Sequence, residues 1–188
     1  ADGLLALREA YGDRLCLRVS MDHYASDLHE LERGGNSWAP MLNGLRWLAD
    51  NHFDINVAGR TLSGEDESVL RQGYGRLFAG NNIPVDAQNP GELVLFPEMD
   101  EALDVPEITT ACWDILNVSP DAMMCASSRM VVKHKGDEAL TVMPCTLLPY
   151  DERFRMGPTL AAGKDAVPLN HPHCARFCVL GGGSCSAG

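Results

Sequence analysis

The sequence lacks any apolar run near the roughly 20 residues that a membrane-spanning helix needs. Residues 1–11 also lack the basic start and apolar stretch of a secretory signal. Basic residues are few: 15 Lys and Arg stand against 26 Asp and Glu, for a net charge of −11. Such a charge repels phosphate backbones and anionic lipids, and no basic stripe reverses it locally. We therefore expect a cytoplasmic protein with neither nucleic acid nor a membrane as partner, and Ala1 leaves open what preceded it.

The remaining composition, 45% hydrophobic and 22% charged, is that of an ordinary globular protein. The unusual feature is a set of seven cysteines. An odd number of cysteines in a chain without a secretory signal favours metal ligation over a disulfide framework. Five of the seven lie from residue 125 onward, which is a clustering that core packing does not explain.

Helices and strands alternate before residue 97. Segments 14–21, 54–59 and 93–96 predict strands, and Ser37 and Ser63 are expected to cap the second and third helices. This alternation predicts an α/β fold with right-handed βαβ units and a parallel sheet. Three strands leave two open sheet edges, so we expect something upstream to be missing.

A fourth helix over 107–118 is expected to join this part to a loop-rich second part. Cys112 falls on the apolar stripe of that helix and Cys16 falls inside a strand, so we expect both to be core residues. The chain is therefore divided into an α/β part, residues 1–108, and a cysteine-rich module, residues 109–188.

The cysteine-rich module contains a predicted β-hairpin, with strands over 130–135 and 140–143 and a glycine-containing turn between them. Cys125 comes just before this hairpin and Cys145 just after it. Because antiparallel pairing brings the two ends of a hairpin together, we expect these thiols to be neighbours.

The C-terminal tail adds Cys174, Cys178 and Cys185. The C-x3-C step suits one helical turn, and a run of three glycines allows the backbone to wrap closely around a bulky centre. With the hairpin pair, five thiols are available, and four thiolates hold an iron–sulfur cluster. Zinc is the competing ion, since His171 and His173 beside Cys174 would allow a mixed ligand set. The long separations and the thiolate set favour the cluster.

The cysteine, hairpin, cysteine and cysteine-rich tail resemble the SPASM module, or its shorter twitch form, of radical S-adenosylmethionine enzymes. The segments that carry the resemblance are Ser128-Arg-Met-Val-Val132, Lys135-Gly136 and Met143-Pro-Cys145. The resemblance implies auxiliary [4Fe–4S] clusters, and five candidate ligands match the twitch form with one cluster.

The first part of the chain agrees with this resemblance. Leu17-Arg-Val-Ser-Met-Asp22, followed by His29 and Arg33-Gly34, is similar to the fourth strand and following loop of the radical S-adenosylmethionine βα barrel. The strands at Ile55 and Leu93 would then be the fifth and sixth strands, which implies a partial, half TIM-like barrel.

Three polar residues are candidates for binding the cofactor. Carried over by position, Ser20 and Asp22 would face the cofactor ribose or the substrate, at the strand ends where such folds collect ligands. Arg60 lies just past the next strand and is a candidate for the same contacts. The alternative is a set of polar strand ends that cap the following loops.

The C-x3-C-x2-C loop and the Gly-Gly-Glu-Pro-like segment of this family occur nowhere in the sequence. Both belong to the first two strands of the family's barrel. The resemblance therefore implies the C-terminal part of an oxidoreductase that binds S-adenosylmethionine only with the missing N-terminal barrel half. Its auxiliary cluster would bind a peptide or small-molecule substrate or relay an electron. The alternative is a non-catalytic binding module stapled by zinc or a cluster. The open sheet edges also predict pairing into a homo-oligomer.

Overall fold

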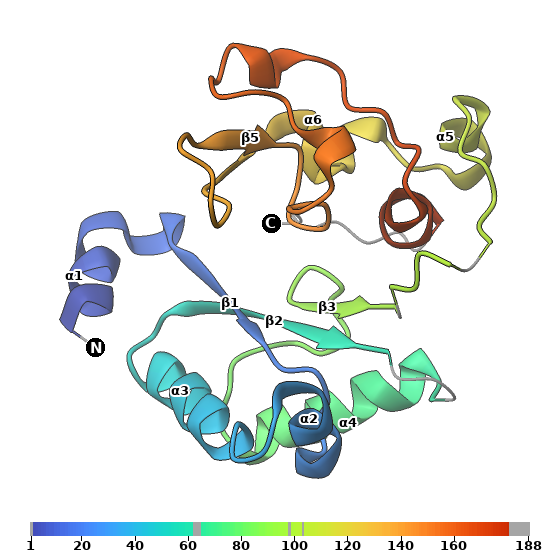
Figure 1. The fold of residues 1–188 in the computed structure, drawn as a ribbon. Coiled ribbons are helices and arrows are strands. Elements are labelled where there is room, and N and C mark those ends of the chain that lie inside the picture. The colour runs from blue at the N-terminus through green and yellow to red at the C-terminus, as the bar shows by residue number, and fades with distance from the viewer. Residues whose placement is uncertain (1, 62–64, 98, 103, 181–188) are drawn as a thin grey trace. The chain divides into compact units, whose positions relative to one another are not determined.

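The computed structural model describes residues 2–61, 65–97, 99–102 and 104–180. The chain forms two compact units, Ala1–Glu98 and Met99–Gly188 (Figure 1). Each unit has a hydrophobic cluster of its own. No helix within these ranges has both the length and the apolarity to cross a bilayer.

The first unit contains a three-stranded parallel sheet. Its strands are β1 (Cys16–Ser20), β2 (Asp54–Arg60) and β3 (Leu93–Phe96), and they lie in the order β1-β2-β3. The register places Ser20 opposite Ala58, so the carboxyl ends of β1 and β2 lie at the same edge. The predicted α/β architecture with a parallel sheet is confirmed.

The helices of this unit are α1 (Asp2–Tyr11), α2 (Ser26–Arg33), α3 (Trp38–Asp50) and α4 (Glu67–Gly80), with a 3-10 turn η1 (Gly12–Arg14). Alternate residues of β2 are buried, because successive side chains of a strand point to opposite faces. Helices α3 and α4 lie on one face of the sheet (Figure 1) and contribute Leu45, Leu70, Tyr74 and Phe78 to the core around Val57.

The predictions for Ser37, Ser63 and Cys16 in this unit have different outcomes. The Ser37 side chain does not cap α3; its hydroxyl instead donates to the Gly34 carbonyl oxygen at 2.7 Å. The expected cap at Ser63 lies outside the described residues. The assignment of Cys16 to the core is wrong: Cys16 is exposed, because it begins the outer strand β1, whose residues are at most half-buried.

The second unit combines short helices with an antiparallel strand pair. Its elements are α5 (Ala111–Leu116), η2 (Pro120–Ala122), α6 (Met124–Ser127), β4 (Met130–Val132), β5 (Thr141–Met143), η3 (Glu152–Phe154), η4 (Ala162–Lys164) and a π-helix, η5 (Cys174–Leu180). Strands β4 and β5 pair with Met130 opposite Met143, as the hairpin prediction requires. All of β5 is buried, and Met143 packs with Leu148, Phe154 and Cys174.

The helix expected over 107–118 is shorter in the structure. Residues 107–110 are not helical, and α5 begins at Ala111. Helix α5 has no buried residue, and Ile115 is 78% exposed, so the apolar stripe finds no core within the described residues. Cys112 is half-buried, and its sulfur accepts from the Thr109 backbone N–H at 3.4 Å. The expectation of a core position for Cys112 is therefore wrong.

Candidate metal centre

Four thiols of the second unit line one small cavity. They are Cys125, Cys145, Cys174 and Cys178, and the rest of the lining is Met124, Leu147, Leu148, Val167 and Leu169. These are four of the five cysteines that the sequence predicts as ligands. The fifth, Cys185, lies outside the described residues.

The hairpin explains how two of these thiols meet. Cys125 lies in α6, shortly before β4, and Cys145 follows β5 by two residues. Because Met130 is opposite Met143, the ends of the pair converge and carry the two cysteines with them. Cys174 and Cys178 are four residues apart in η5, a spacing of about one helical turn. The cavity therefore collects thiols from three separate segments.

Arg129 holds the corner between α6 and β4. Its guanidinium group donates to the Cys125 carbonyl oxygen at 2.6 Å and to the Gly163 carbonyl oxygen at 2.6 Å. These bonds tie the segment that carries Cys125 to the loop around η4. Arginine forms several such bonds at fixed angles, because its donors lie in a planar fork. Arg129 is therefore a positioning residue for Cys125, a role that its sequence context does not reveal.

The environment of the thiols is apolar. Burial raises the pKa of Cys125 and of Cys145, and it raises the pKa of Cys174 to about 11. At neutral pH these groups are uncharged thiols, so a bound metal must displace their protons. The cavity volume is about 20 Å³, which is space for about one water molecule. A single ion fits this volume, whereas a cluster needs the cysteine-bearing segments to move outward.

A second group of potential ligands lies in the same unit. His171 Nε2 is 3.5 Å from Glu101 Oε1 and 3.6 Å from Asp151 Oδ2, and His173 Nε2 is 3.6 Å from Glu101 Oε1. The ligand atoms of Glu101, His171 and His173 all lie within 4.8 Å of one another, and Cys174 does not belong to this group. The histidines thus face carboxylates rather than the thiol next to them in the sequence.

The predicted cofactor residues of the first unit lie at the carboxyl end of the sheet. Ser20 is exposed at the end of β1, and the buried Asp22 forms an ion pair with Arg33. The backbone N–H of Arg60 donates to the Asp22 carbonyl oxygen at 3.1 Å, whereas the Arg60 side chain pairs with Glu32. The backbone therefore brings Asp22 and Arg60 together, and their side chains take other partners.

A polar network that sequence reasoning missed follows β1 directly. The Tyr24 hydroxyl donates to Glu65 Oε1 at 2.7 Å, and His23 Nε2 lies 2.9 Å from Glu65 Oε2. His23 Nδ1 accepts from the Ala25 backbone N–H, so a neutral His23 carries its proton on Nε2 and donates to Glu65. The hydrogen bond from Tyr24 lowers the pKa of Glu65. The sequence signal that could have indicated this network is the position of His23 and Tyr24 just after a predicted strand.

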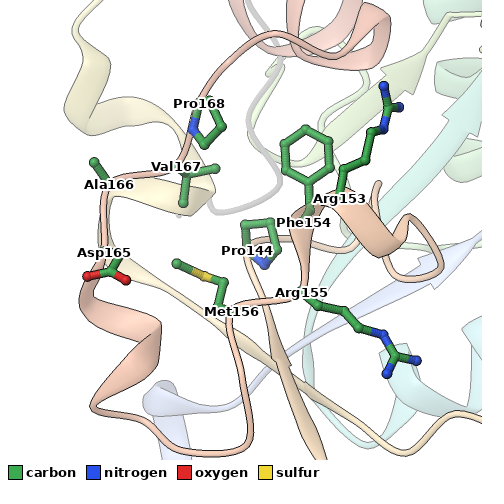
Figure 2. Close-up of a pocket in the computed structure, with 9 residues that line it drawn as sticks. All are labelled: Pro144, Arg153, Phe154, Arg155, Met156, Asp165, Ala166, Val167 and Pro168. Carbon is green, nitrogen blue, oxygen red and sulfur yellow. The ribbon is translucent and has the colours of Figure 1, made fainter.

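A separate cavity of about 210 Å³ lies beside β5 (Figure 2), lined by Pro144, Arg153, Phe154, Arg155, Met156, Asp165, Ala166, Val167 and Pro168. Figure 2 shows the guanidinium groups of Arg153 and Arg155 pointing away from Met156. Arg153 pairs with Asp151 at 2.6 Å and Arg155 with Asp137 at 2.9 Å. The cavity is smaller than the roughly 300 Å³ at which ligand pockets begin, and its cations are already paired.

Comparisons of the chain with protein-family models, with curated proteins and with solved structures give no match. The function is therefore argued from the residues themselves.

Proposed function

We propose that the chain is the C-terminal part of a radical S-adenosylmethionine oxidoreductase, whose second unit holds an auxiliary [4Fe–4S] cluster. The observation that carries this proposal is the cavity lined by Cys125, Cys145, Cys174 and Cys178. The sequence resemblance to a twitch-like module names the same thiols as ligands. Four thiolates are the usual ligand set of such a cluster.

The spacing of the thiols supports a centre larger than one ion. Zinc with four sulfur ligands at about 2.3 Å holds them about 3.8 Å apart at the corners of a tetrahedron. Among the described residues, the four thiols do not form a group whose sulfur atoms all lie within 4.8 Å of one another. The irons of a cubane cluster are spread over several corners, so its thiolates stand farther apart than those of zinc.

In this proposal the cluster binds a peptide or small-molecule substrate or relays an electron. The apolar side chains around the thiols, among them Leu148 and Val167, exclude water from the sulfur atoms. Exclusion of water and hydrogen bonding to sulfur are the means by which a protein sets a cluster's potential. The residues of this chain thus supply the ligands, the dry lining and, through Arg129, a fixed position for Cys125.

The first unit takes the place of the later strands of a partial βα barrel in this proposal. Ser20, Asp22 and Arg60 would face the ribose of S-adenosylmethionine or the substrate once the missing N-terminal barrel half is present. Their location at the carboxyl end of parallel strands supports this assignment, since α/β folds bind ligands there. The open edge of β1 or β3 would pair with that half or with a second copy.

The first experiment is elemental analysis of the full chain purified without oxygen. We expect about four irons and four sulfides per chain with a brown visible spectrum. Cys174→Ser removes a buried thiol that lines the cavity, and Cys112→Ser, outside it, is the matched control. The proposal fails if Cys174→Ser retains as much iron and sulfide as Cys112→Ser.

One observation favours a second candidate, a non-catalytic module folded around zinc. The cavity of about 20 Å³ has room for a single ion but not for a cluster, and the four sulfur atoms would close around that ion by moving inward. A small loop-rich unit gains folding free energy from such a metal. A colourless protein with zinc, no iron, and zinc loss in Cys174→Ser would establish this module instead.

A further inference from the structure

Four side chains from three segments converge beside the thiol cavity without being part of it: Glu101, Asp151, His171 and His173. Cys174 lines the thiol cavity, whereas His171 lines a different cavity together with Glu101 and Asp151. Leu147 and Leu148 line both cavities and form an apolar wall shared by them.

The distances within this group are too long for hydrogen bonds. The His171 and His173 Nε2 atoms stand 3.5 and 3.6 Å from Glu101 Oε1, whereas a hydrogen bond from nitrogen to oxygen spans about 2.7–3.2 Å. Ligands held about 2.0–2.1 Å from a tetrahedral zinc ion lie about 3.3–3.4 Å from one another. The separations therefore match a shell around a small cation within a few tenths of an ångström.

Burial of the two rings strengthens this assignment. His171 is 2% exposed and His173 is 8% exposed. Buried polar groups normally have a partner, and the Nε2 atoms of both rings face the Glu101 carboxylate at distances longer than a hydrogen bond.

We propose that Glu101, His171 and His173 bind a zinc ion, and that this site is distinct from the thiol centre. Two histidines with one carboxylate form a known zinc set, and the same donors also suit ferrous iron. Glu101 supplies the negative charge of this ligand set. This site does not depend on the proposed function, because it shares no ligand with the thiol cavity.

The zinc site opens to a cavity of about 400 Å³ lined by Glu101, Leu147, Leu148, Pro149, Tyr150, Asp151, Arg153 and His171. This volume lies within the range of about 300–1,000 Å³ of small-molecule sites. Glu101 is 65% exposed and forms the solvent side of the site. With three protein ligands, a small molecule in the cavity would reach the metal at its fourth coordination position.

Metal binding has a specific consequence for the His171 ring. Its Nδ1 atom accepts from the His173 backbone N–H at 3.1 Å, so the neutral ring carries its proton on Nε2. Zinc at Nε2 displaces the proton from that atom; with the proton on Nδ1 the ring no longer accepts from the His173 backbone N–H, so this hydrogen bond breaks when zinc binds. Nitrogen NMR of the imidazole rings distinguishes the two tautomers, so it reports directly on binding through Nε2.

The experiment titrates Co²⁺, as a spectroscopic substitute for zinc, into the metal-free full chain without oxygen. Cobalt bound by imidazole and carboxylate shows visible bands without the near-ultraviolet charge transfer that thiolates add. The variants are Glu101→Gln and His173→Gln, matched with Glu138→Gln and His52→Asn, in which the replaced residues are exposed and outside the site. We expect the two site variants to bind this cobalt at least about tenfold more weakly, and the two controls to bind as the native chain does.

Two results would overturn the zinc site. One is a cobalt spectrum that shows only thiolate-type bands. The other is equal affinity for Glu101→Gln and Glu138→Gln; Glu101 is mostly exposed, so its substitution leaves the fold intact even if His173→Gln fails to fold. Iron and sulfide measured on the same preparations separate the two proposals, because loss of the zinc site leaves the thiol centre unchanged.

Discussion

Tyr74 offers a direct test of how the sheet edge near the proposed cofactor residues is held. This side chain of α4 is fully buried, and its hydroxyl donates to the Met21 carbonyl oxygen at 2.7 Å. Met21 stands between Ser20 and Asp22, so this bond fixes the backbone at the end of β1. The substitution Tyr74→Phe removes the hydroxyl and keeps the ring.

The expected effect follows from burial. The ring still fills its place, so no large cavity opens, and the cost is one hydrogen bond plus an unsatisfied buried carbonyl, about 1–3 kcal/mol. For a domain of this size, about 1 kcal/mol changes Tm by roughly 4–8 °C. A central value of about 2 kcal/mol thus lowers the Tm of the first unit by roughly 8–16 °C.

The assay is thermal unfolding of the full chain, with hydrogen exchange at the β1 and β2 amides to assign the transition to the first unit. Tyr11→Phe is the control, because Tyr11 is 51% exposed and its change should stay within about 0.5 kcal/mol. If the Tyr74→Phe protein has the same Tm as the Tyr11→Phe protein, the argument that this hydrogen bond holds the strand end is refuted.

Three further predictions rest on burial and close packing. Burial lowers the pKa of His29, so the unfolded state binds more protons, and the free energy of unfolding falls as pH drops below about 6.5. The substitution His29→Gln should reduce this loss of stability between pH 7 and pH 5, as measured by urea titration. An equal loss in the variant and the native chain would contradict the prediction. Gly73→Ala places a Cβ 2.5 Å from Tyr24 Cδ1, whereas at Gly75 the nearest atom is 3.7 Å away. We expect Gly73→Ala to destabilise by about 1–3 kcal/mol and Gly75→Ala to stabilise by up to about 1 kcal/mol, and the reverse order would refute this reading of the packing. Cys174, buried and with its pKa raised to about 11, should react with iodoacetamide at pH 8 far more slowly in the folded metal-free chain than in urea; equal rates would show that the thiol is not buried.

Local sequence patterns predicted most of the regular elements. Short apolar runs predicted the strands at 54–59 and 93–96, because such a run is a property of neighbouring residues. The hairpin could be predicted for the same reason, and with it the approach of Cys125 and Cys145. Cysteine spacing then added Cys174 and Cys178 as partners, and the structure places all four thiols around one cavity.

Tertiary structure decided what depended on burial. The apolar stripe of 107–118 predicted a long helix, but a stripe specifies a helix only where a core receives it, and α5 buries nothing among the described residues. Cys16 reads as a core residue from its apolar neighbours, yet it is exposed because β1 is the outer strand.

The meeting of distant polar groups was decided in the same way. Glu65 joins His23 and Tyr24 from 41 residues or more away. Glu101 reaches His171 across an even longer stretch of chain. Acidic side chains on loops are usually solvated, so nothing local distinguishes these from the other carboxylates of an acidic chain. Only the folding of the loops onto a buried histidine pair selects them, because long-range contacts are set by packing rather than by sequence periodicity.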